Sequence, residues 1–291
     1  VCSSDLSMLQ ALERLDIHNR NQILGGTVGF LSAMVLLFLL DAGLLSVIIG
    51  IILSQLIIAA GGISLIHRMA KGFSLPSRTT IEYYLVNGLK LHINAIAGFI
   101  ISGSDVLMLS YYRGLDETAY YQMAVQLMGL PLLIPYAANM VIYGKVGTMG
   151  ANGAWEFNRK LLMQVTLLMV GISIAAGATA QWWFPLIFGE VFNQSVEIFR
   201  WLLLACVGMT FSTIMAPQWI ARGFFMMTSV LAIIVACVNL VLNWMLIPEY
   251  GMYGAAGATL VAYLISIVIN GLMFIYCDNQ HRIYKSEING L

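Results

Sequence analysis

Long apolar stretches, separated by short polar turns, follow one another along most of the chain. At 1.5 Å of rise per residue, a helix of about 20 residues crosses the roughly 30 Å hydrocarbon core of a bilayer. Eight stretches are long and apolar enough to do so. Their boundaries are predicted at 23–40, 44–66, 81–112, 118–143, 161–183, 198–221, 224–247 and 253–276. The pattern predicts an all-α polytopic membrane protein with about eight transmembrane helices.

The third stretch carries polar residues along one side. Lys90, Asn94, Gly98, Ser102 and Asp105 follow one another at helical spacing and therefore share one face. An ionised side chain at the bilayer centre costs at least about 2.5–3.5 kcal/mol. This face is therefore expected to contact other helices or to border a wet pathway.

Two connecting segments have a distinct composition. Residues 144–158 are rich in glycine and are predicted to form a loop. Residues 184–197 follow a tryptophan pair and are predicted to lie at the membrane interface, because Trp prefers the headgroup level. Small residues at helical spacing in the fifth stretch predict a face where helices approach closely. They are Gly171, Ala175 and Ala178.

Composition excludes a water-soluble fold and narrows the function. Hydrophobic residues make up 60% of the chain and charged residues only 10%, against roughly a quarter charged in soluble domains. The formal net charge is zero, so no nucleic-acid partner is expected. The sequence shows no nucleophile constellation, phosphate-cradling loop or metal-ligand spacing. We therefore expect no enzyme, no cofactor and no metal.

The distribution of basic residues predicts the orientation. With both termini in the cytoplasm, only Arg113 and Arg200 fall in outer loops, which the positive-inside rule favours. The remaining Lys and Arg residues, apart from Lys90, then lie on the cytoplasmic side. They are Arg14, Arg20, Arg68, Lys71, Arg78, Lys145, Arg159, Lys160, Arg222, Arg282 and Lys285.

Several motifs resemble those of the polysaccharide flippases of the multidrug/oligosaccharidyl-lipid/polysaccharide (MOP) exporter superfamily, the O-antigen or Wzx-like transporters. The helices of this chain begin and end with residues similar to those of that family. Two positions depart from the family pattern: Ala119 stands where a Gly is usual, and Gly144 stands where a Pro is usual. The motifs are Ser104-Asp105 before an apolar run, the acidic turn and helix start with Glu117, Tyr121 and Ala124, FGEVF at 188–192, Asn239 with Asn243, and LIPEYGMYGAAGATLVAY at 246–263.

The resemblance implies a fold of two pseudo-symmetric six-helix lobes. In that frame, the chain holds one complete six-helix lobe and two helices of the other, and we expect it to be the C-terminal part of a longer, N-terminally truncated protein. The expected parts are a cytoplasmic amphipathic segment (1–22, with 1–6 an artefact or an ordinary polar loop), the last two helices of the N-terminal lobe (23–66), an inter-lobe linker (67–80), the C-terminal lobe (81–277) and a cytoplasmic tail (278–291).

The same resemblance implies a function. The chain is expected to flip an undecaprenyl-pyrophosphate-linked oligosaccharide across the bacterial inner membrane by alternating access, driven by a proton or sodium gradient. Membrane lipids, a polysaccharide polymerase and a chain-length regulator are the implied partners.

Two charged residues of the polar face invite different hypotheses. Lys90 is a candidate contact for the pyrophosphate, since an ammonium is a suitable point charge for phosphate; alternatively it snorkels to the headgroups. Asp105 is a candidate for ion coupling, or else has a packing role near the outer end of its helix. The two residues are about 22 Å apart along one helix and cannot pair directly.

Neutral polar residues inside the apolar stretches are a second group of candidates. They could bind sugar hydroxyls, although such residues also hold helices together. They are Asn94, Gln126, Asn139, Asn239 and Asn243. His92 is expected to pack between helices rather than to relay protons.

Three other interpretations stay open. The chain could be a drug or metabolite exporter of the multidrug branch. It could be a membrane-embedded polysaccharide polymerase or ligase, although such enzymes need a long outer loop rich in Arg and His. It could also be a truncated fragment of a flippase gene without activity of its own.

Overall fold

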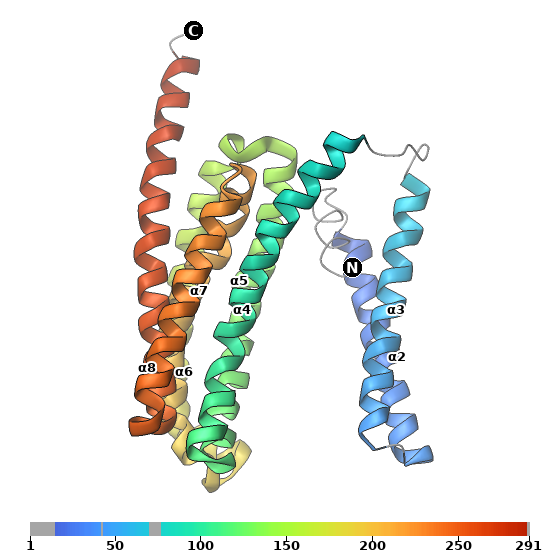
Figure 1. The fold of residues 1–291 in the computed structure, drawn as a ribbon, viewed down its shortest axis with the longest axis vertical. Coiled ribbons are helices and arrows are strands. Elements are labelled where there is room, and N and C mark those ends of the chain that lie inside the picture. The colour runs from blue at the N-terminus through green and yellow to red at the C-terminus, as the bar shows by residue number, and fades with distance from the viewer. Residues whose placement is uncertain (1–14, 42, 70–76, 290–291) are drawn as a thin grey trace. The chain divides into compact units, whose positions relative to one another are not determined.

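A computed structural model describes residues 15–41, 43–69 and 77–289, and all of their secondary structure is helical. Residues 1–6, and residues 70–76 of the predicted linker 67–80, lie outside this part of the chain. Figure 1 shows the elements. They are α2 (Leu15–Leu40), α3 (Leu44–Met69), α4 (Arg78–Arg113), α5 (Leu115–Gly153), α6 (Trp155–Phe188), the 3-10 helix η1 (Glu190–Gln194), α7 (Ser195–Ala221) and α8 (Phe225–Asn289).

Seven helices of the described chain are long and apolar enough to cross a membrane. The prediction of an all-α polytopic membrane protein with about eight spans is confirmed, because the seventh and eighth stretches both lie in α8. This 65-residue element is broken at Gly251, whose φ of 56° and ψ of −133° are not helical. Pro248 lies just before the break and removes a backbone donor. The chain reverses there, at the lower end of α8 in Figure 1.

The chain divides into two compact units, Val1–Arg78 with Tyr143–Thr148, and Thr79–Ile142 with Met149–Leu291. In the first unit, α2 and α3 form a hairpin that brings two backbones close together. A Cβ atom on Gly29 would lie 2.6 Å from the carbonyl oxygen of Gly50, and one on Gly50 would lie 2.6 Å from that of Gly29. Only glycine permits this approach, as is common between membrane helices.

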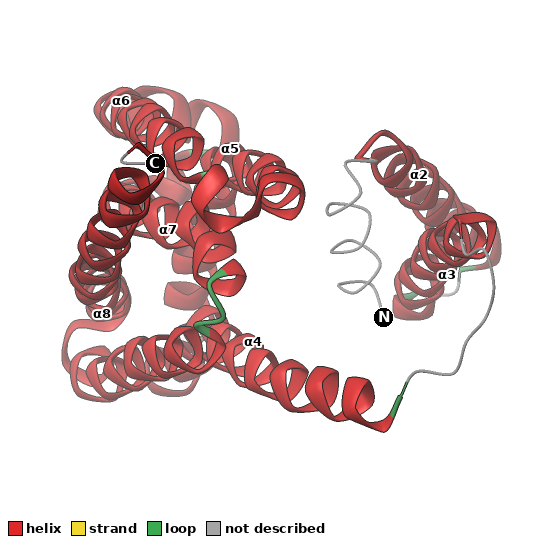
Figure 2. Ribbon diagram, turned by 90° about the horizontal axis from the view of Figure 1, so that it is seen from above, coloured by secondary structure: helices red, strands yellow, loops and turns green. Residues whose placement is uncertain are grey.

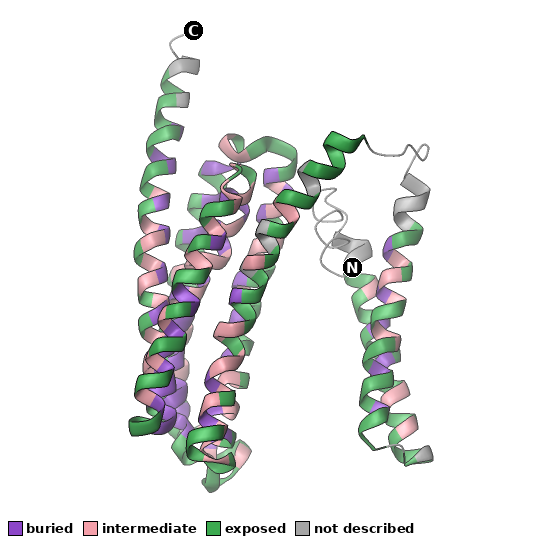
Figure 3. Cartoon of the chain, in the orientation of Figure 1, coloured by how far each residue is buried: buried purple, intermediate pink, exposed green. Residues whose placement is uncertain are grey.

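The second unit contains six helical segments, namely α4 to α7 and the two halves of α8. Figure 2 shows these segments end-on. α7 packs against α6 and α8. The span that contains it is the most buried of the seven in the described chain, with over half of the residues in its apolar stretch inside the structure. Figure 3 shows the burial along each helix. The core of this unit therefore forms around α7.

Three expectations about local structure are wrong. The glycine-rich segment 144–158 is helical: α5 continues to Gly153 with a local break at Gly150, and α6 begins at Trp155. In α6, the predicted packing face is exposed, and Ser173 and Ala180 are buried instead. His92 is also exposed rather than packed between helices. Glycine content, the spacing of small residues and the residue type at position 92 did not predict these outcomes, because tertiary contacts decide which side of a helix is covered.

Candidate functional site

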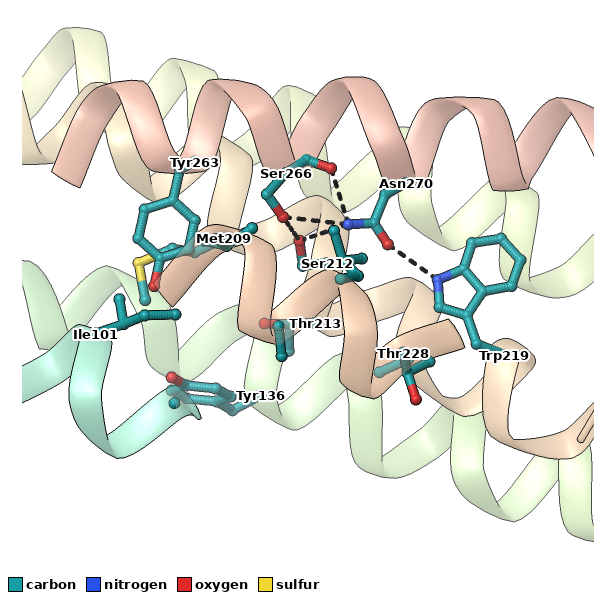
Figure 4. A pocket seen from close by; sticks show the side chains of 15 residues that line it. Ile101, Tyr136, Met209, Ser212, Thr213, Trp219, Thr228, Tyr263, Ser266 and Asn270 are labelled. Atoms are coloured by element: carbon teal, nitrogen blue, oxygen red, sulfur yellow. Dashed lines mark hydrogen bonds between the residues drawn. The ribbon is translucent and has the colours of Figure 1, made fainter. Parts of the chain in front are cut away.

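A cavity of about 410 Å³ lies within the second unit. It is bordered by residues from α4, α5, α7 and both halves of α8, so nearly every segment of the six-helix unit contributes to its wall. Figure 4 shows the side chains around it. None of these 15 described residues is charged. The volume is within the range of about 300–1,000 Å³ that is typical of small-molecule sites.

A network of hydrogen bonds forms the polar side of the cavity. Asn270 is 1% exposed, and its amide nitrogen donates to Ser212 Oγ at 3.1 Å and to Ser266 Oγ at 3.2 Å. The Ser212 and Ser266 hydroxyls are 2.8 Å apart. The indole N–H of Trp219 donates to Asn270 Oδ1 at 3.0 Å. These bonds hold a hydroxyl-rich patch between α7 and the second half of α8 (Figure 4).

Two tyrosines lie at the other end of the same cavity. Tyr136 of α5 and Tyr263 of α8 both line it (Figure 4). Tyrosine combines a large apolar ring face with a hydroxyl that can donate and accept. The cavity therefore offers aromatic surface, hydroxyls and an amide, which suits a neutral polyhydroxylated ligand.

A second polar feature surrounds Asp105, near the C-terminal end of α4. Its side chain is 5% exposed. The Tyr121 hydroxyl of α5 donates to Asp105 Oδ2 at 2.5 Å, and the backbone N–H of Val106 donates to Oδ1 at 2.9 Å. The structure shows no cation within ion-pair distance of this carboxyl group among the described residues. A buried carboxyl group with only neutral partners can change its charge by binding a proton or a small cation.

Ser104, which precedes Asp105 on α4, contacts a cluster of amide side chains on α8. Ser104 Oγ donates to Asn239 Oδ1 at 3.4 Å, and the amide nitrogen of Asn243 donates to the same oxygen at 3.1 Å. Asn239 in turn donates to Thr259 Oγ1 at 3.4 Å, which links the two halves of α8. Asn239 and Asn243 are fully buried, and Asn243 Oδ1 has no hydrogen-bond donor among the described residues. This oxygen is a free acceptor close to the Asp105 region.

The acidic turn before Tyr121 also has a structural role. The Glu117 carboxylate lies 3.6 Å from Arg113 Nε and accepts the backbone N–H of Met252 at 3.2 Å. Met252 directly follows the break of α8 at Gly251. The turn between α4 and α5 is thereby tied to the reversal of α8.

The other predicted site residues are distributed unevenly. Lys90 and Asn94 lie in α4, but their side chains are outside the described part of the structure. Gln126 is exposed, whereas Gln122, one turn earlier, has a buried amide oxygen without a described donor. Asn139 donates to the backbone carbonyl of Thr213, which itself lines the cavity. Gln126 and Asn139 are not among the described residues that border the cavity.

Gly98 of the predicted polar face borders the cavity, but the polar residues of α8 that border it were missed in the sequence, although a signal was present. Tyr263, Ser266 and Asn270 recur at steps of three and four along the last apolar stretch. This is the spacing that marked the polar face of α4. Trp219 had no comparable signal, because a tryptophan near a helix end usually indicates an interface.

Comparison with known proteins shows similarity to one family over part of the chain. Residues 5–143 match the family described as "Polysaccharide biosynthesis protein". No curated protein matches the chain.

Solved structures with a similar fold are transporters. An outward-facing multidrug resistance MATE family transporter of the MOP superfamily is 13% identical, with a TM-score of 0.63 over 89% of this chain and 61% of that one. A MATE protein in the bent conformation is 15% identical, with a TM-score of 0.63 over 89% of this chain and 62% of that one. A MOP superfamily transporter from Pyrococcus furiosus is 14% identical, with a TM-score of 0.59 over 87% and 61%.

The chain thus spans about three fifths of the length of these transporters. At such identities the similarity shows the fold. Together, the helical architecture, the match over residues 5–143 and the shared fold agree with the resemblance predicted from the motifs: this is a multi-pass membrane protein with the fold of MOP superfamily transporters, and part of it is similar to the family described as "Polysaccharide biosynthesis protein".

Proposed function

We propose that the chain is part of a flippase that moves an undecaprenyl-pyrophosphate-linked oligosaccharide across the bacterial inner membrane by alternating access. The observation that carries this proposal is the uncharged cavity within the six-helix unit, whose largely apolar wall carries hydroxyls and an amide. The hydroxyls of Ser212 and Ser266 and the amide of Asn270 can exchange hydrogen bonds with sugar hydroxyls. The rings of Tyr136 and Tyr263 can cover the apolar faces of a sugar.

The charged pyrophosphate of such a substrate requires residues other than those that line the cavity. In this proposal, Lys90 contacts the pyrophosphate, and Asn94 and Gln126 contact the sugar. Asn139, Asn239 and Asn243 shape the polar interior through the bonds described above.

Asp105 supplies the coupling to an ion gradient in this proposal. Its buried carboxyl group changes charge when it takes up a proton or a sodium ion. The short bond from Tyr121 would then rearrange, because that hydroxyl donates to the charged carboxylate. Such a change is a means of linking ion uptake to helix movement.

The proposed setting follows from the same reasoning. Both termini face the cytoplasm, in agreement with the distribution of basic residues. A polysaccharide polymerase and a chain-length regulator would use the translocated units on the outer side.

A variant that fills the cavity tests the proposal. Gly98 lines the cavity, and a Cβ atom there would meet nothing within 4 Å, so Gly98→Leu occupies the cavity without a backbone clash. We expect surface polysaccharide to be restored in a flippase-null strain by the unmodified gene and not by Gly98→Leu. Gly103→Leu, on the same helix but outside the cavity, is the matched control. Full restoration by Gly98→Leu would contradict the role of the cavity.

A drug or metabolite exporter is the second candidate, because the similar solved structures include multidrug resistance transporters. The aromatic and apolar walls of the cavity would also suit a drug. Drug-susceptibility assays in an exporter-deficient strain separate the two functions: an exporter raises the tolerated drug concentration, whereas a flippase restores polysaccharide without this effect.

A further inference from the structure

A second cavity, of about 540 Å³, lies at the end of the unit that carries the α5–α6 and α7–α8 turns. Both turns are at the upper end of the helices in Figure 1. Polar side chains of Asn152, Arg222 and Gln280 line the cavity, together with Tyr276 and Cys277 of α8. Unlike the first cavity, this cavity is lined by a charged residue, Arg222.

Arg222 is held in one position by two contacts. Its Nη1 donates to Asn152 Oδ1 at 2.8 Å, and its guanidinium group lies 5.1 Å from the centre of the Trp155 ring. These contacts fix the guanidinium group against the turn between α5 and α6. Neither contact supplies a negative charge.

Two donors of Arg222 have no acceptor. Nε and Nη2 are both buried and make no hydrogen bond with any described residue. Asp278, which shares Trp155 as a partner with Arg222, accepts the indole N–H of that residue at 3.0 Å and pairs with Arg282 at 2.9 Å and Arg159 at 3.6 Å. The charge of Arg222 therefore has no carboxylate partner in the described structure.

Arg222 is half-buried, and its two buried donors without an acceptor are energetically costly. Burial lowers the pKa of the Arg222 guanidinium from its ordinary value, but arginine stays charged in proteins. An anion is the partner that satisfies both the charge and the donors. The planar fork of a guanidinium group binds phosphate oxygens especially well.

The position of Arg222 along the membrane normal identifies the source of such an anion. One apolar span ends at Ala221 and the next begins at Phe225, so Arg222 lies at a membrane boundary. Lipid phosphates lie at this level, next to the hydrocarbon core.

We propose that the cavity around Arg222 binds the phosphate group of a membrane lipid. The phosphate belongs either to a glycerophospholipid headgroup or to the pyrophosphate of a polyprenyl-linked substrate, and the same chemistry serves both. The first source is independent of the proposed transport function, whereas the second would make this cavity an entry site for the substrate.

The experiment measures ligand-induced thermal stabilisation of the purified full chain in detergent. The probes are phosphatidylglycerol, farnesyl pyrophosphate and diacylglycerol, the last of which has acyl chains without a phosphate. Three variants are compared with the unmodified chain. Arg222→Gln removes the charge, Gln280→Glu places a carboxylate in the cavity to compete with the phosphate, and Arg282→Gln is the control at the same end of the unit.

We expect at least one phosphate probe to stabilise the unmodified chain and diacylglycerol not to do so. Binding should weaken about tenfold or more in Arg222→Gln and Gln280→Glu, and stay unchanged in Arg282→Gln. Stabilisation by phosphatidylglycerol identifies a phospholipid headgroup as the source of the bound phosphate. Stabilisation by farnesyl pyrophosphate alone identifies the pyrophosphate of a polyprenyl-linked substrate as that source.

Gln280→Glu keeps the proposal testable if Arg222→Gln does not fold, because Gln280 is exposed and the new carboxylate can accept from the unsatisfied donors of Arg222. The proposal is overturned if no phosphate probe stabilises the chain, if diacylglycerol acts equally well, or if Gln280→Glu binds the probes as tightly as the unmodified chain. The assay measures binding alone, so a failure of transport would not affect its outcome.

Discussion

Replacement of Asp105 by Asn separates a role in ion coupling from a role in packing. The carboxyl group is buried and has two hydrogen bonds, from the Tyr121 hydroxyl and the Val106 backbone N–H. An amide has nearly the same shape. Its oxygen can still accept the backbone bond, and its nitrogen can donate to the tyrosine hydroxyl, which can reverse its role. The variant therefore keeps the contacts and loses the charge.

The expected magnitudes follow from these contacts. Each neutral hydrogen bond contributes about 0.5–1.5 kcal/mol net, and both are retained, so the free energy of unfolding should change by no more than about 1 kcal/mol. The cost of holding a buried charge is also removed. Asp105→Leu, in contrast, leaves the buried Tyr121 hydroxyl without its acceptor and should destabilise the chain by about 1–3 kcal/mol.

The assay combines two measurements on the same variants. Unfolding is followed by denaturant titration in detergent micelles, and transport by restoration of surface polysaccharide in a flippase-null strain. Asp105→Asn should fold normally and lose transport by more than tenfold. Asp116→Asn, which alters an exposed carboxylate at the start of α5, should change neither measurement. Full transport by Asp105→Asn would refute the ion-coupling hypothesis.

Three further predictions concern stability, each measured by unfolding in detergent micelles. A Cβ atom on Gly254 would lie 2.5 Å from the carbonyl oxygen of Leu246, so Gly254→Ala should destabilise the hairpin of α8 by about 1–3 kcal/mol. A Cβ atom on Gly171 would meet nothing within 4 Å, so Gly171→Ala should be neutral or stabilising. Equal stability of the two variants would contradict the close approach at Gly254. Trp219→Phe removes the indole donor of the cavity network and should cost about 1–3 kcal/mol; no change would mean that this bond contributes nothing. Glu117→Ala removes the partly exposed ion pair and the acceptor at the α8 break and should cost about 1 kcal/mol, a loss that Glu117→Gln should partly restore.

The helical membrane architecture could be predicted from the sequence because it depends on local properties. Length and apolarity determine whether a segment can span a bilayer. Of the polar face along α4, Asp105 is buried, whereas Gly98 and Ser102 are exposed. The break in α8 was also readable, since Pro248 and Gly251 disfavour a continuous helix. The glycine-rich segment 144–158 misled the same reasoning, because its helix is favoured by tertiary packing despite its composition.

The sites depend on contacts between distant parts of the chain. Ser104 and Asn239 are 135 residues apart, and Trp155 and Asp278 are 123 residues apart, yet each pair shares a hydrogen bond. The sequence favours Arg222 as a basic residue of a cytoplasmic turn, with contact to a lipid phosphate as the weaker alternative, and only the structure shows that two of its donors are buried without an acceptor. A sequence therefore determines which segments enter the membrane, since that is a property of each segment alone. Only the tertiary structure decides which polar groups find partners, because hydrogen bonding in an apolar interior depends on which helices meet.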